Sequence, residues 1–303
     1  MLLRLPGTVR LMAAVVAVAI QSLVTAAAQT TLVPVQEEAS LLGGERAQGA
    51  VIWSHGRSRQ TECSLAPTPE YIGVFRAAGW DTFRLNRPRI ADTQAASGAA
   101  LADAAEALKH RGYRRVVLAG QSFGAFISLI AAGLSDAVDA VIGTAPAAYG
   151  SAQSNPSGFG QNATGLYDLL GAVRRARVAL FFFEGDVFDP GGRGPMVDQI
   201  LAARGLAHVV IDKPAGLLTH WAAAGSGFAT EYASCLVAFA AGNLRASTLN
   251  CRMQVASAHI GGTAGLSPPV LPRSTPVLHE NSPSIVDLKI GRREDVSRAL
   301  GRR

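Results

Sequence analysis

The sequence predicts an α/β protein with a mainly parallel central sheet and helices on both faces. Between about residues 50 and 242, short apolar runs alternate with segments of helical periodicity. Strands joined by helices need crossover connections, which make neighbouring strands parallel. The runs are apolar almost throughout, as expected for strands covered on both faces. With 49% hydrophobic and 17% charged residues, the 303-residue chain can build one large core.

Local patterns place the elements in chain order. Weak alternation of apolar residues indicates one or two edge strands within residues 30–49, and short apolar runs indicate the buried strands. The first helix, 67–78, has Thr68 as its predicted cap and Pro69 in its first turn, and Gly79 ends it. Strands are expected at 50–54, 81–85, 115–120, 137–142, 178–183 and 208–211. Helices are expected at 67–78, 95–109, 166–175, 194–204 and 228–241, with a further one directly after the strand at 115–120.

The loops after the strands are the expected place for a functional site. The carboxyl ends of parallel strands meet at one edge of a sheet, and ligands bind along that edge. In this chain the residues at or just after the strand ends are His55, Arg87, Ser122, Ala145, Gly185 and Pro214. Residues 147–165 are rich in Gly, Ser, Asn and Ala, which predicts a surface loop or a partial lid.

The strongest local feature is Gly120-Gln121-Ser122-Phe123-Gly124, which joins an apolar run to a helix. The two glycines allow a tight strand-to-helix turn in which a β-carbon would crowd its neighbours. Such a turn exposes Ser122 at the end of a strand and the start of a helix. There its hydroxyl can act as a nucleophile, and the backbone N–H of Phe123 can face a developing oxyanion. An ordinary Gly/Ser turn is the alternative interpretation.

A serine hydroxyl needs a neighbouring base to remove its proton, and the chain has six histidines. Two of them, His55 and His220, lie in loops at the predicted active edge. His220 follows the last strand, downstream of Ser122 and of the acidic candidates, and is therefore predicted to be the general base. His55 is interpreted as a structural residue of its loop.

The base in turn needs a carboxylate to hold its tautomer and to stabilise the imidazolium. Asp186 and Asp189 both lie in the loop after the strand at 178–183. Asp189 is the preferred acid, because it stands a few residues beyond the strand and directly before Pro190, a rigid setting. Asp186 lies closer to the strand and is the alternative acid, or else caps the loop backbone.

A second oxyanion donor, besides the N–H of Phe123, is expected from the loop that follows the strand at 50–54. The backbone N–H of Gly56 or of Arg57 is the candidate. The Arg57 side chain could also contact a substrate carboxylate or phosphate, although an ordinary exposed arginine explains it equally well.

Together these motifs resemble the α/β-hydrolase family. The matching parts lie within residues 50–242 and are the His55-Gly56 turn, the turn at 120–124, the loop at 185–190 and His220. The resemblance implies a Ser-Asp/Glu-His triad, an acyl-enzyme on Ser122 and no cofactor. Within the family, the compact size and the scarcity of cap sequence look most like small serine esterases and dienelactone-hydrolase-like proteins.

One departure from the family pattern concerns the acid. The loop carries an extra residue between Gly185 and Asp189 relative to the usual Gly-x-x-Asp, which keeps the choice between Asp186 and Asp189 open. We expect a serine hydrolase that cleaves small carboxylic esters. A peptidase or amidase with the same triad, and a non-catalytic exported binding protein that retains the fold, are the alternatives.

The amino terminus predicts export. Arg4 and Arg10 mark a positive region, residues 11–24 are apolar, and Ala26–Ala28 offers a cleavage site. Residues 1–28 are therefore predicted to be a signal peptide rather than a retained anchor, because the apolar stretch is short for a span of about 20 residues. The mature protein is expected in the periplasm or outside the cell, without stable membrane insertion.

The formal charge of +6 is unevenly distributed. Residues 245–303 hold nine of the 28 Lys and Arg residues but only four of the 22 Asp and Glu residues. The body of the chain is therefore nearly neutral, and nucleic acid is not an expected ligand. Residues 251–303 are rich in Pro and Ser and then basic, and they are interpreted as a mobile tail. This leaves residues 29–250 as one catalytic domain.

Three cysteines, Cys63, Cys235 and Cys251, remain after signal cleavage. In an oxidising compartment two of them are expected to pair, and Cys235 with Cys251 is the favoured pair, with three separate thiols as the alternative. Their spacing fits no zinc pattern, and no metal is predicted.

Overall fold

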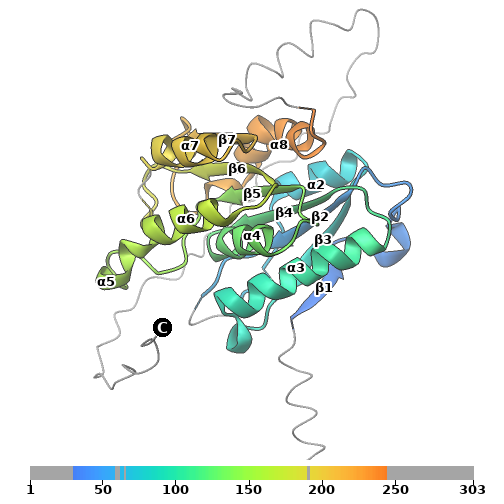
Figure 1. Cartoon of the computed structure of the whole chain (residues 1–303), viewed down its shortest axis with the longest axis horizontal. Coiled ribbons are helices and arrows are strands. Elements are labelled where there is room, and N and C mark those ends of the chain that lie inside the picture. Colours follow the sequence, from blue (N-terminus) through green and yellow to red (C-terminus); the bar gives the residue numbers. More distant parts are fainter. Residues whose placement is uncertain (1–29, 59–61, 65, 190–191, 244–303) are drawn as a thin grey trace, which may run out of the picture. The chain divides into compact units, whose positions relative to one another are not determined.

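The computed structural model describes residues 30–243, apart from 59–61, 65 and 190–191. The predicted signal peptide at 1–28 and tail at 251–303 lie outside these residues and remain predictions. The described chain forms a sheet in the order β1-β3-β2-β4-β5-β6-β7 (Figure 1). Its strands are β1 (Thr31–Pro34), β2 (Ala50–Ser54), β3 (Asp81–Asn86), β4 (Val116–Gln121), β5 (Ala140–Thr144), β6 (Arg177–Phe182) and β7 (His208–Asp212).

The strand pairing confirms the predicted α/β class with a mainly parallel sheet. β1 pairs antiparallel with β3 at one edge, and all the other described pairs are parallel. Every residue of β2, β4 and β5 is buried, as expected from their apolar runs. The register places Ser54 beside Gly120, and Gln121 beside Thr144. The exits of β2, β4 and β5 therefore lie next to one another.

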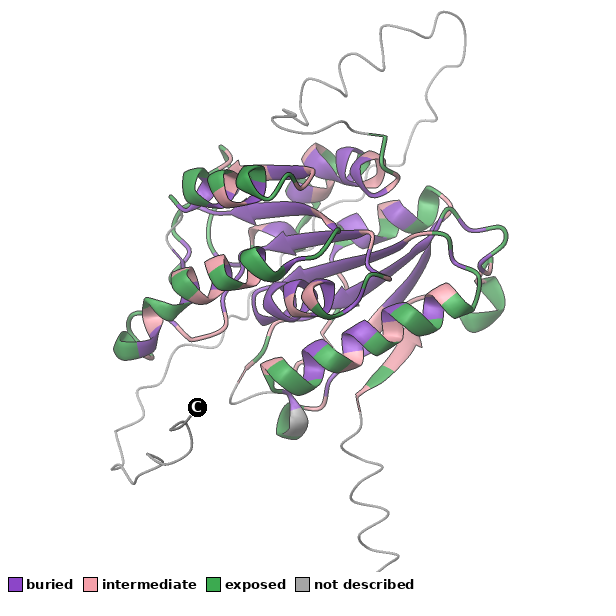
Figure 2. Cartoon of the chain, in the orientation of Figure 1, coloured by how far each residue is buried: buried purple, intermediate pink, exposed green. Residues whose placement is uncertain are grey.

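Helices cover both faces of the sheet. The α-helices are α2 (Glu70–Ala77), α3 (Gln94–His110), α4 (Phe123–Leu134), α5 (Pro156–Phe159), α6 (Gln161–Ala172), α7 (Gly194–Ala203) and α8 (Ser226–Ala240), and the 3-10 turns are η1 (Glu38–Ser40), η2 (Arg89–Ala91) and η3 (Ala222–Ala224). α3, α4, α6 and α7 pack on one face, and α2 and α8 pack on the other. In β4, Leu118 belongs to the hydrophobic core on the side of α3, α4, α6 and α7, and Val117 belongs to the core on the side of α2 and α8. Figure 2 shows the buried strands between these two helical layers.

Several elements differ from the sequence prediction. β5 begins at Ala140 rather than at 137, and α6 spans Gln161–Ala172 rather than 166–175. α2 begins at Glu70 rather than at 67, and Thr68 does not cap it. Pro69 stands at the N-cap with φ −59° and ψ 150°, and proline also disfavours the helical conformation in the residue before it. In the predicted loop 147–165, α5 leads through Gly160 (φ −60°, ψ −25°) into α6, because Gly160 keeps helical dihedral angles.

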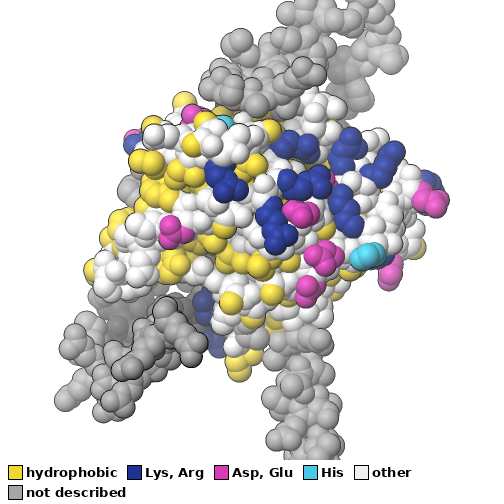
Figure 3. All heavy atoms as spheres, in the orientation of Figure 1, with side chains coloured by type: hydrophobic (Ala, Val, Ile, Leu, Met, Phe, Trp, Pro, Cys, Tyr) yellow, Lys and Arg dark blue, Asp and Glu magenta, His cyan; other side chains and the backbone are white. Residues whose placement is uncertain are grey.

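On the face of the molecule seen in Figure 3, Lys and Arg side chains gather at the upper right, with Asp and Glu side chains among and below them. Asp139 is an example of local balance, since Lys109 Nζ lies 2.6 Å and Arg175 Nη2 lies 3.4 Å from its carboxylate oxygens. Among the described helices, none is both long enough and apolar enough to cross a membrane. Cys235, on α8, is disulfide-bonded. Its expected partner, Cys251, lies outside the described residues, so this pairing stays a prediction.

Candidate active site

Ser122 occupies the sharp turn between β4 and α4. Its φ of 57° and ψ of −119° belong to a region that residues with a β-carbon rarely adopt. A β-carbon on Gly120 would collide with the backbone of Gly124, and one on Gly124 would collide with the backbone of Ser54. The two glycines therefore permit the turn, and Ser122 carries its strain.

His220 lies in the loop after β7, and its ring is held from two sides. Its Nδ1 lies 2.8 Å from Oδ2 of Asp186, and both side chains are buried. Because a carboxylate can only accept, Nδ1 carries a proton, and in the neutral imidazole Nε2 then has the lone pair. The ring of Phe188 lies 4.4 Å from the imidazole, and that of Trp221 lies 5.2 Å away at a steep angle.

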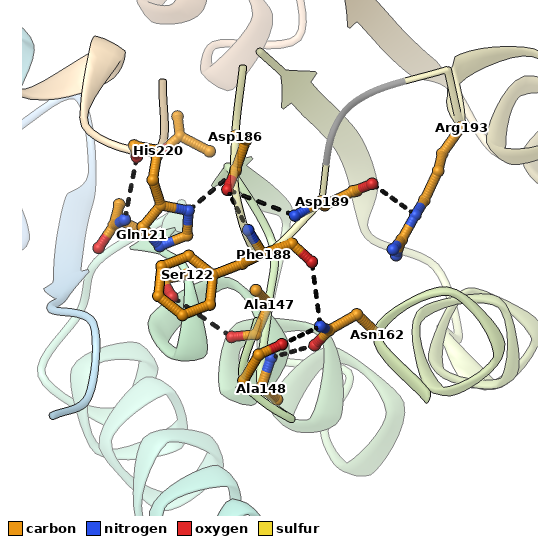
Figure 4. Close-up of polar contacts among 12 residues, drawn as sticks. Gln121, Ser122, Ala147, Ala148, Asn162, Asp186, Phe188, Asp189, Arg193 and His220 are labelled. Carbon is orange, nitrogen blue, oxygen red and sulfur yellow. Dashed lines mark hydrogen bonds and ion pairs between the residues drawn. The ribbon is translucent and has the colours of Figure 1, made fainter. Parts of the chain in front are cut away.

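Asp186 is itself oriented by its own loop. Its second oxygen, Oδ1, accepts hydrogen bonds from the backbone N–H of Phe188 at 2.8 Å and of Asp189 at 3.3 Å. The carboxylate thus has partners at both oxygens and stands fixed against His220 (Figure 4). This is the arrangement that sets the tautomer of a general base.

The structure places the alternative acid, Asp186, and not the preferred Asp189, against His220. The chain turns at Gly185, which has φ +72°, so that the next residue, Asp186, points to His220. Asp189 lies on the far side of the loop and forms an ion pair with Arg193 at 2.7 Å (Figure 4). Of the two candidate acids, Asp186 contacts the imidazole, and Asp189 anchors the loop to the start of α7.

Ser122 and His220 both line one cavity of about 830 Å³. The Ser122 hydroxyl donates to the backbone oxygen of Ala147 at 3.4 Å. Because a hydroxyl has one proton, Ser122 must give up the hydrogen bond to Ala147 before it can donate to His220. Such hydrogen bonds are often formed only when a substrate is bound.

The candidate oxyanion donors surround Ser122. Phe123 is the first residue of α4, so its N–H has no acceptor within the helix. A β-carbon on Gly56 would lie 3.4 Å from Cβ of Ser122 and 2.6 Å from Oε1 of Gln121, which shows how closely the loop after β2 approaches the serine. The exposed side chain of Arg57 stacks over the ring of Phe123, with Cζ 5.3 Å from its centroid.

His55 sits at the turn between β2 and this loop, in the structural position expected from the sequence. Its Nδ1 lies 2.6 Å from the backbone oxygen of Gly56 and 3.0 Å from Nη2 of Arg87. Burial, together with the charge of Arg87, lowers the pKa of His55 to about 4. An imidazole with so low a pKa is a weak base, which leaves His220 as the candidate base.

Sequence reasoning missed two residues that hold the site together. Buried Asn162, from α6, accepts hydrogen bonds from the N–H groups of Ala148 and Tyr149, both at 2.9 Å, and donates to the carbonyls of Gly150 and Phe188. Gln121 donates to the backbone oxygen of His220 at 3.3 Å. Gln121 lies in the predicted turn at 120–124, and Asn162 lies in the predicted loop at 147–165. A single amide side chain belongs to no motif, so neither role could be predicted.

The walls of the cavity are mostly apolar and contain no acidic residue among those described. Trp53, Pro67, Phe188, Trp221 and Ala223 contribute to them, and Arg57 is a charged residue at the rim. Within the described chain, no three His, Cys, Asp or Glu side chains gather in a way that could hold a metal ion.

The fold is similar to that of solved hydrolases. An acylaminoacyl peptidase, solved with a peptidyl chloromethyl ketone, shares 13% identity over 74% of this chain and 41% of its own, with a TM-score of 0.50. Dipeptidyl peptidase 4 of Porphyromonas gingivalis shares 11% identity over 71% of this chain and 36% of its own, with a TM-score of 0.50. A puromycin-hydrolysing peptidase of Mycobacterium tuberculosis shares 16% identity over 73% of this chain and 39% of its own, with a TM-score of 0.49.

The chain thus spans about two fifths of the length of these three proteins. No protein-family model and no curated protein sequence matches it. At such low identities a structural likeness speaks for the fold alone. It agrees with the mainly parallel, seven-stranded sheet covered by helices on both faces. The described chain therefore has the α/β-hydrolase fold.

Proposed function

We propose that the protein is a serine hydrolase that cleaves carboxylic esters through an acyl-enzyme on Ser122. The observation that carries this proposal is the 2.8 Å contact between Asp186 and His220, whose imidazole lines the same cavity as the strained Ser122. Two candidate oxyanion donors, the N–H groups of Phe123 and of Gly56 or Arg57, lie beside the serine. The proposal concerns these residues, and no metal or cofactor enters it.

The reaction follows from the placement of the groups. Nε2 of His220 takes the proton of the Ser122 hydroxyl as its oxygen attacks the ester carbonyl, and Asp186 stabilises the resulting imidazolium. The carbonyl oxygen gains negative charge and binds the candidate N–H donors. His220 then gives the proton to the leaving alcohol. Water repeats the sequence on the acyl-enzyme and releases the acid.

Amide or peptide cleavage by the same residues is the second candidate. It is supported by the likeness to an acylaminoacyl peptidase and a dipeptidyl peptidase 4. The cavity walls argue for a neutral apolar ester instead. A free peptide amino terminus is positively charged, and none of the described lining residues offers a carboxylate to bind it. The apolar walls suit the acyl or alcohol part of a small ester, in keeping with the small-esterase subtype.

Hydrolysis of short- and medium-chain p-nitrophenyl esters, together with labelling by a fluorophosphonate, tests the proposal. Wild-type protein is expected to turn over the esters and to be labelled at Ser122, and Ser122→Ala to do neither. Ser154→Ala, which changes another serine of the cavity wall, is the matched control and should remain active. A folded wild type that is neither active nor labelled would favour the non-catalytic binding protein. Activity on anilides but not on esters would favour the amidase.

Export belongs to the same proposal and rests on the sequence of residues 1–28. Amino-terminal sequencing of protein recovered from the periplasm or the medium tests it. Cleavage near Ala28 is the expected result, and an intact amino terminus in the cytoplasmic fraction contradicts it.

A further inference from the structure

Arg87, directly after β3, is a buried cation next to the candidate oxyanion site. Its side chain is 0% exposed, and burial lowers its pKa to about 10, so the guanidinium keeps its charge at neutral pH. A charge in this position is stable only if partners replace the water that it loses. Its partners therefore indicate what the residue does.

One partner balances the charge, and the others belong to the loop after β2. Nη1 lies 3.6 Å from Oδ1 of Asp92, and the same oxygen accepts a hydrogen bond from Ser97 at 2.7 Å. Nη2 donates to the backbone oxygen of His55 and lies 3.4 Å from that of Gly56. Asp92, itself bound by Ser97, thus contacts one end of the guanidinium. The other end contacts two successive carbonyl groups, and the oxygen of the second, Gly56, also lies 2.6 Å from Nδ1 of His55.

These two carbonyl groups fix the candidate oxyanion donors, because each peptide unit is planar. In a trans peptide the C=O and the following N–H point in opposite directions, and the described chain contains no cis peptide. The oxygen of His55 shares a plane with the N–H of Gly56, and the oxygen of Gly56 shares one with the N–H of Arg57. A guanidinium that holds both oxygens on its side turns both N–H groups away from itself.

The same cation lies over the side chain of Phe123, the residue whose backbone N–H is the first candidate donor. Cζ of Arg87 is 5.4 Å from the centroid of the Phe123 ring, and Cζ of Arg57 is 5.3 Å from it. The backbone N–H of Phe123 begins α4, whose amino terminus also carries partial positive charge. Negative charge that develops on a substrate oxygen beside Ser122 would therefore meet fixed positive charge.

We propose that Arg87 is the positioning residue of the oxyanion site, which holds the Gly56 and Arg57 peptides so that their N–H groups face the substrate. The assignment rests on the proposed function, since it needs a reaction at Ser122. It gives Arg87 no contact with the substrate. Its effect reaches the reaction through the loop peptides and through its charge.

Arg87→Met and Arg87→Lys test the assignment on the full chain. Methionine removes the donors and the charge, whereas lysine keeps the charge but lacks the planar fork that reaches two carbonyls and Asp92 together. The control is Arg177→Met. Arg177 is a partly buried arginine at the start of β6 that also donates to a backbone carbonyl, of Ala240, and also stacks on an aromatic ring, of Phe239. Arg177 thus resembles Arg87 in its carbonyl and ring contacts. It lies at the amino end of its strand, whereas Arg87 lies at the carboxyl end of its strand, where Ser122 is.

The measurements are kcat and KM for a p-nitrophenyl ester, the rate of fluorophosphonate labelling, and Ki for a trifluoromethyl ketone. Circular dichroism gives the folded fraction of each sample, and all three measurements are calculated with the concentration of folded protein. Removal of one oxyanion donor costs about 100- to 1,000-fold in rate, so displaced donors should cost about 10- to 100-fold. In Arg87→Met we expect this loss in kcat, labelling rate and ketone affinity alike, with little change in KM. Arg87→Lys should be intermediate, and Arg177→Met should match the wild type.

A purely structural role gives a different pattern. If Arg87→Met and Arg87→Lys lower the melting temperature but keep kcat and ketone affinity per folded molecule, the assignment is wrong. If Arg87→Met does not fold, Arg87→Lys decides by the same criterion. A wild type that reacts at Ser122 while both variants remain fully active removes this inference and leaves the proposed function intact. A wild type that neither turns over esters nor is labelled removes both.

Discussion

Nδ1 of His220 lies 2.8 Å from Oδ2 of Asp186, although 34 residues separate them in the chain. The loops after β6 and β7 bring them together. Beyond the ends of these strands, Glu184 forms a further parallel bridge with Leu218, and the N–H of Thr219 donates to the Glu184 carbonyl at 2.8 Å. Strand pairing thus continues into the loops and sets the distance between the acid and the base.

Asp186→Asn should abolish most of the activity, whereas Asp189→Asn should not. An amide at position 186 no longer stabilises an imidazolium and allows the wrong tautomer, which in a comparable triad lowers kcat by about 10⁴-fold. Asp189 does not contact the imidazole, so kcat should stay within about 10-fold of wild type. Its loss leaves buried Arg193 without its carboxylate, which is strongly destabilising, by about 3 to 5 kcal/mol.

Ester hydrolysis and urea unfolding of the two variants separate these effects. Asp186→Asn should be folded and inactive, and Asp189→Asn should be active and less stable. The opposite pattern would return the acid role to Asp189.

Ser122→Gly should make the protein more stable while it removes the nucleophile. At φ 57° and ψ −119° the backbone of a serine is strained by about 1 to 3 kcal/mol, whereas glycine adopts such angles freely. For a domain of this size each kcal/mol raises the melting temperature by about 2 to 4 °C. Ser122→Ala is the matched control, since alanine keeps the β-carbon and the strain. Equal melting temperatures for the Gly and Ala variants would show that the turn stores no strain.

The fold and the order of the site residues could be predicted because they depend on local patterns. Apolar runs and helical periodicity identify strands and helices, and glycines that leave no room for a β-carbon identify the turn at Ser122. His220 was singled out by its place after the last strand, since neighbouring loops share one edge of the sheet.

The choice between Asp186 and Asp189 could not be made in the same way. Both follow the same strand, and which one faces His220 depends on the direction in which the chain turns at Gly185. Arg87 and Asn162 act through backbone groups of other loops. Such contacts require the positions of peptide planes, and residue types in a sequence do not contain them.

Asn162→Ala should reduce both stability and activity. The variant removes four hydrogen bonds and leaves the N–H groups of Ala148 and Tyr149 and the carbonyls of Gly150 and Phe188 to find other partners. The four hydrogen bonds are partly buried, and each contributes about 0.5 to 1.5 kcal/mol, so we expect a loss of about 2 to 6 kcal/mol.

Activity should fall as well, because Phe188 packs on the imidazole of His220 and residues 148–150 form part of the cavity wall. Asn155→Ala is the control, since it removes one comparable hydrogen bond, to the Tyr149 carbonyl at 2.7 Å, and one longer, exposed hydrogen bond from Ser157 at 3.3 Å. Urea unfolding and kcat/KM decide the matter. If the two variants lose equal stability, Asn162 has no special role in joining the two loops.

His55→Gln should make the free energy of unfolding less dependent on pH between about pH 4 and pH 7. In the folded protein burial and Arg87 lower the pKa of His55 to about 4, whereas the unfolded chain has the ordinary value of 6.5. Between these two pH values the unfolded state binds a proton that the folded state does not, so the free energy of unfolding falls as the pH is lowered. This single group should account for a loss on the order of 2 to 3 kcal/mol between pH 7 and pH 4.

Urea unfolding of wild type and His55→Gln at several pH values from 4 to 8 tests this. At pH 8 His55 is neutral in both states, and the difference between the proteins there reports the hydrogen bond of Nδ1, which is made either to the Gly56 carbonyl or with the Arg87 guanidinium, depending on the tautomer. As the pH falls, only the wild type should lose the contribution of His55, and the two curves should converge. Parallel curves would mean that His55 is protonated in the folded protein as readily as in the unfolded chain. A buried imidazole beside the guanidinium of Arg87 makes that outcome electrostatically unfavourable.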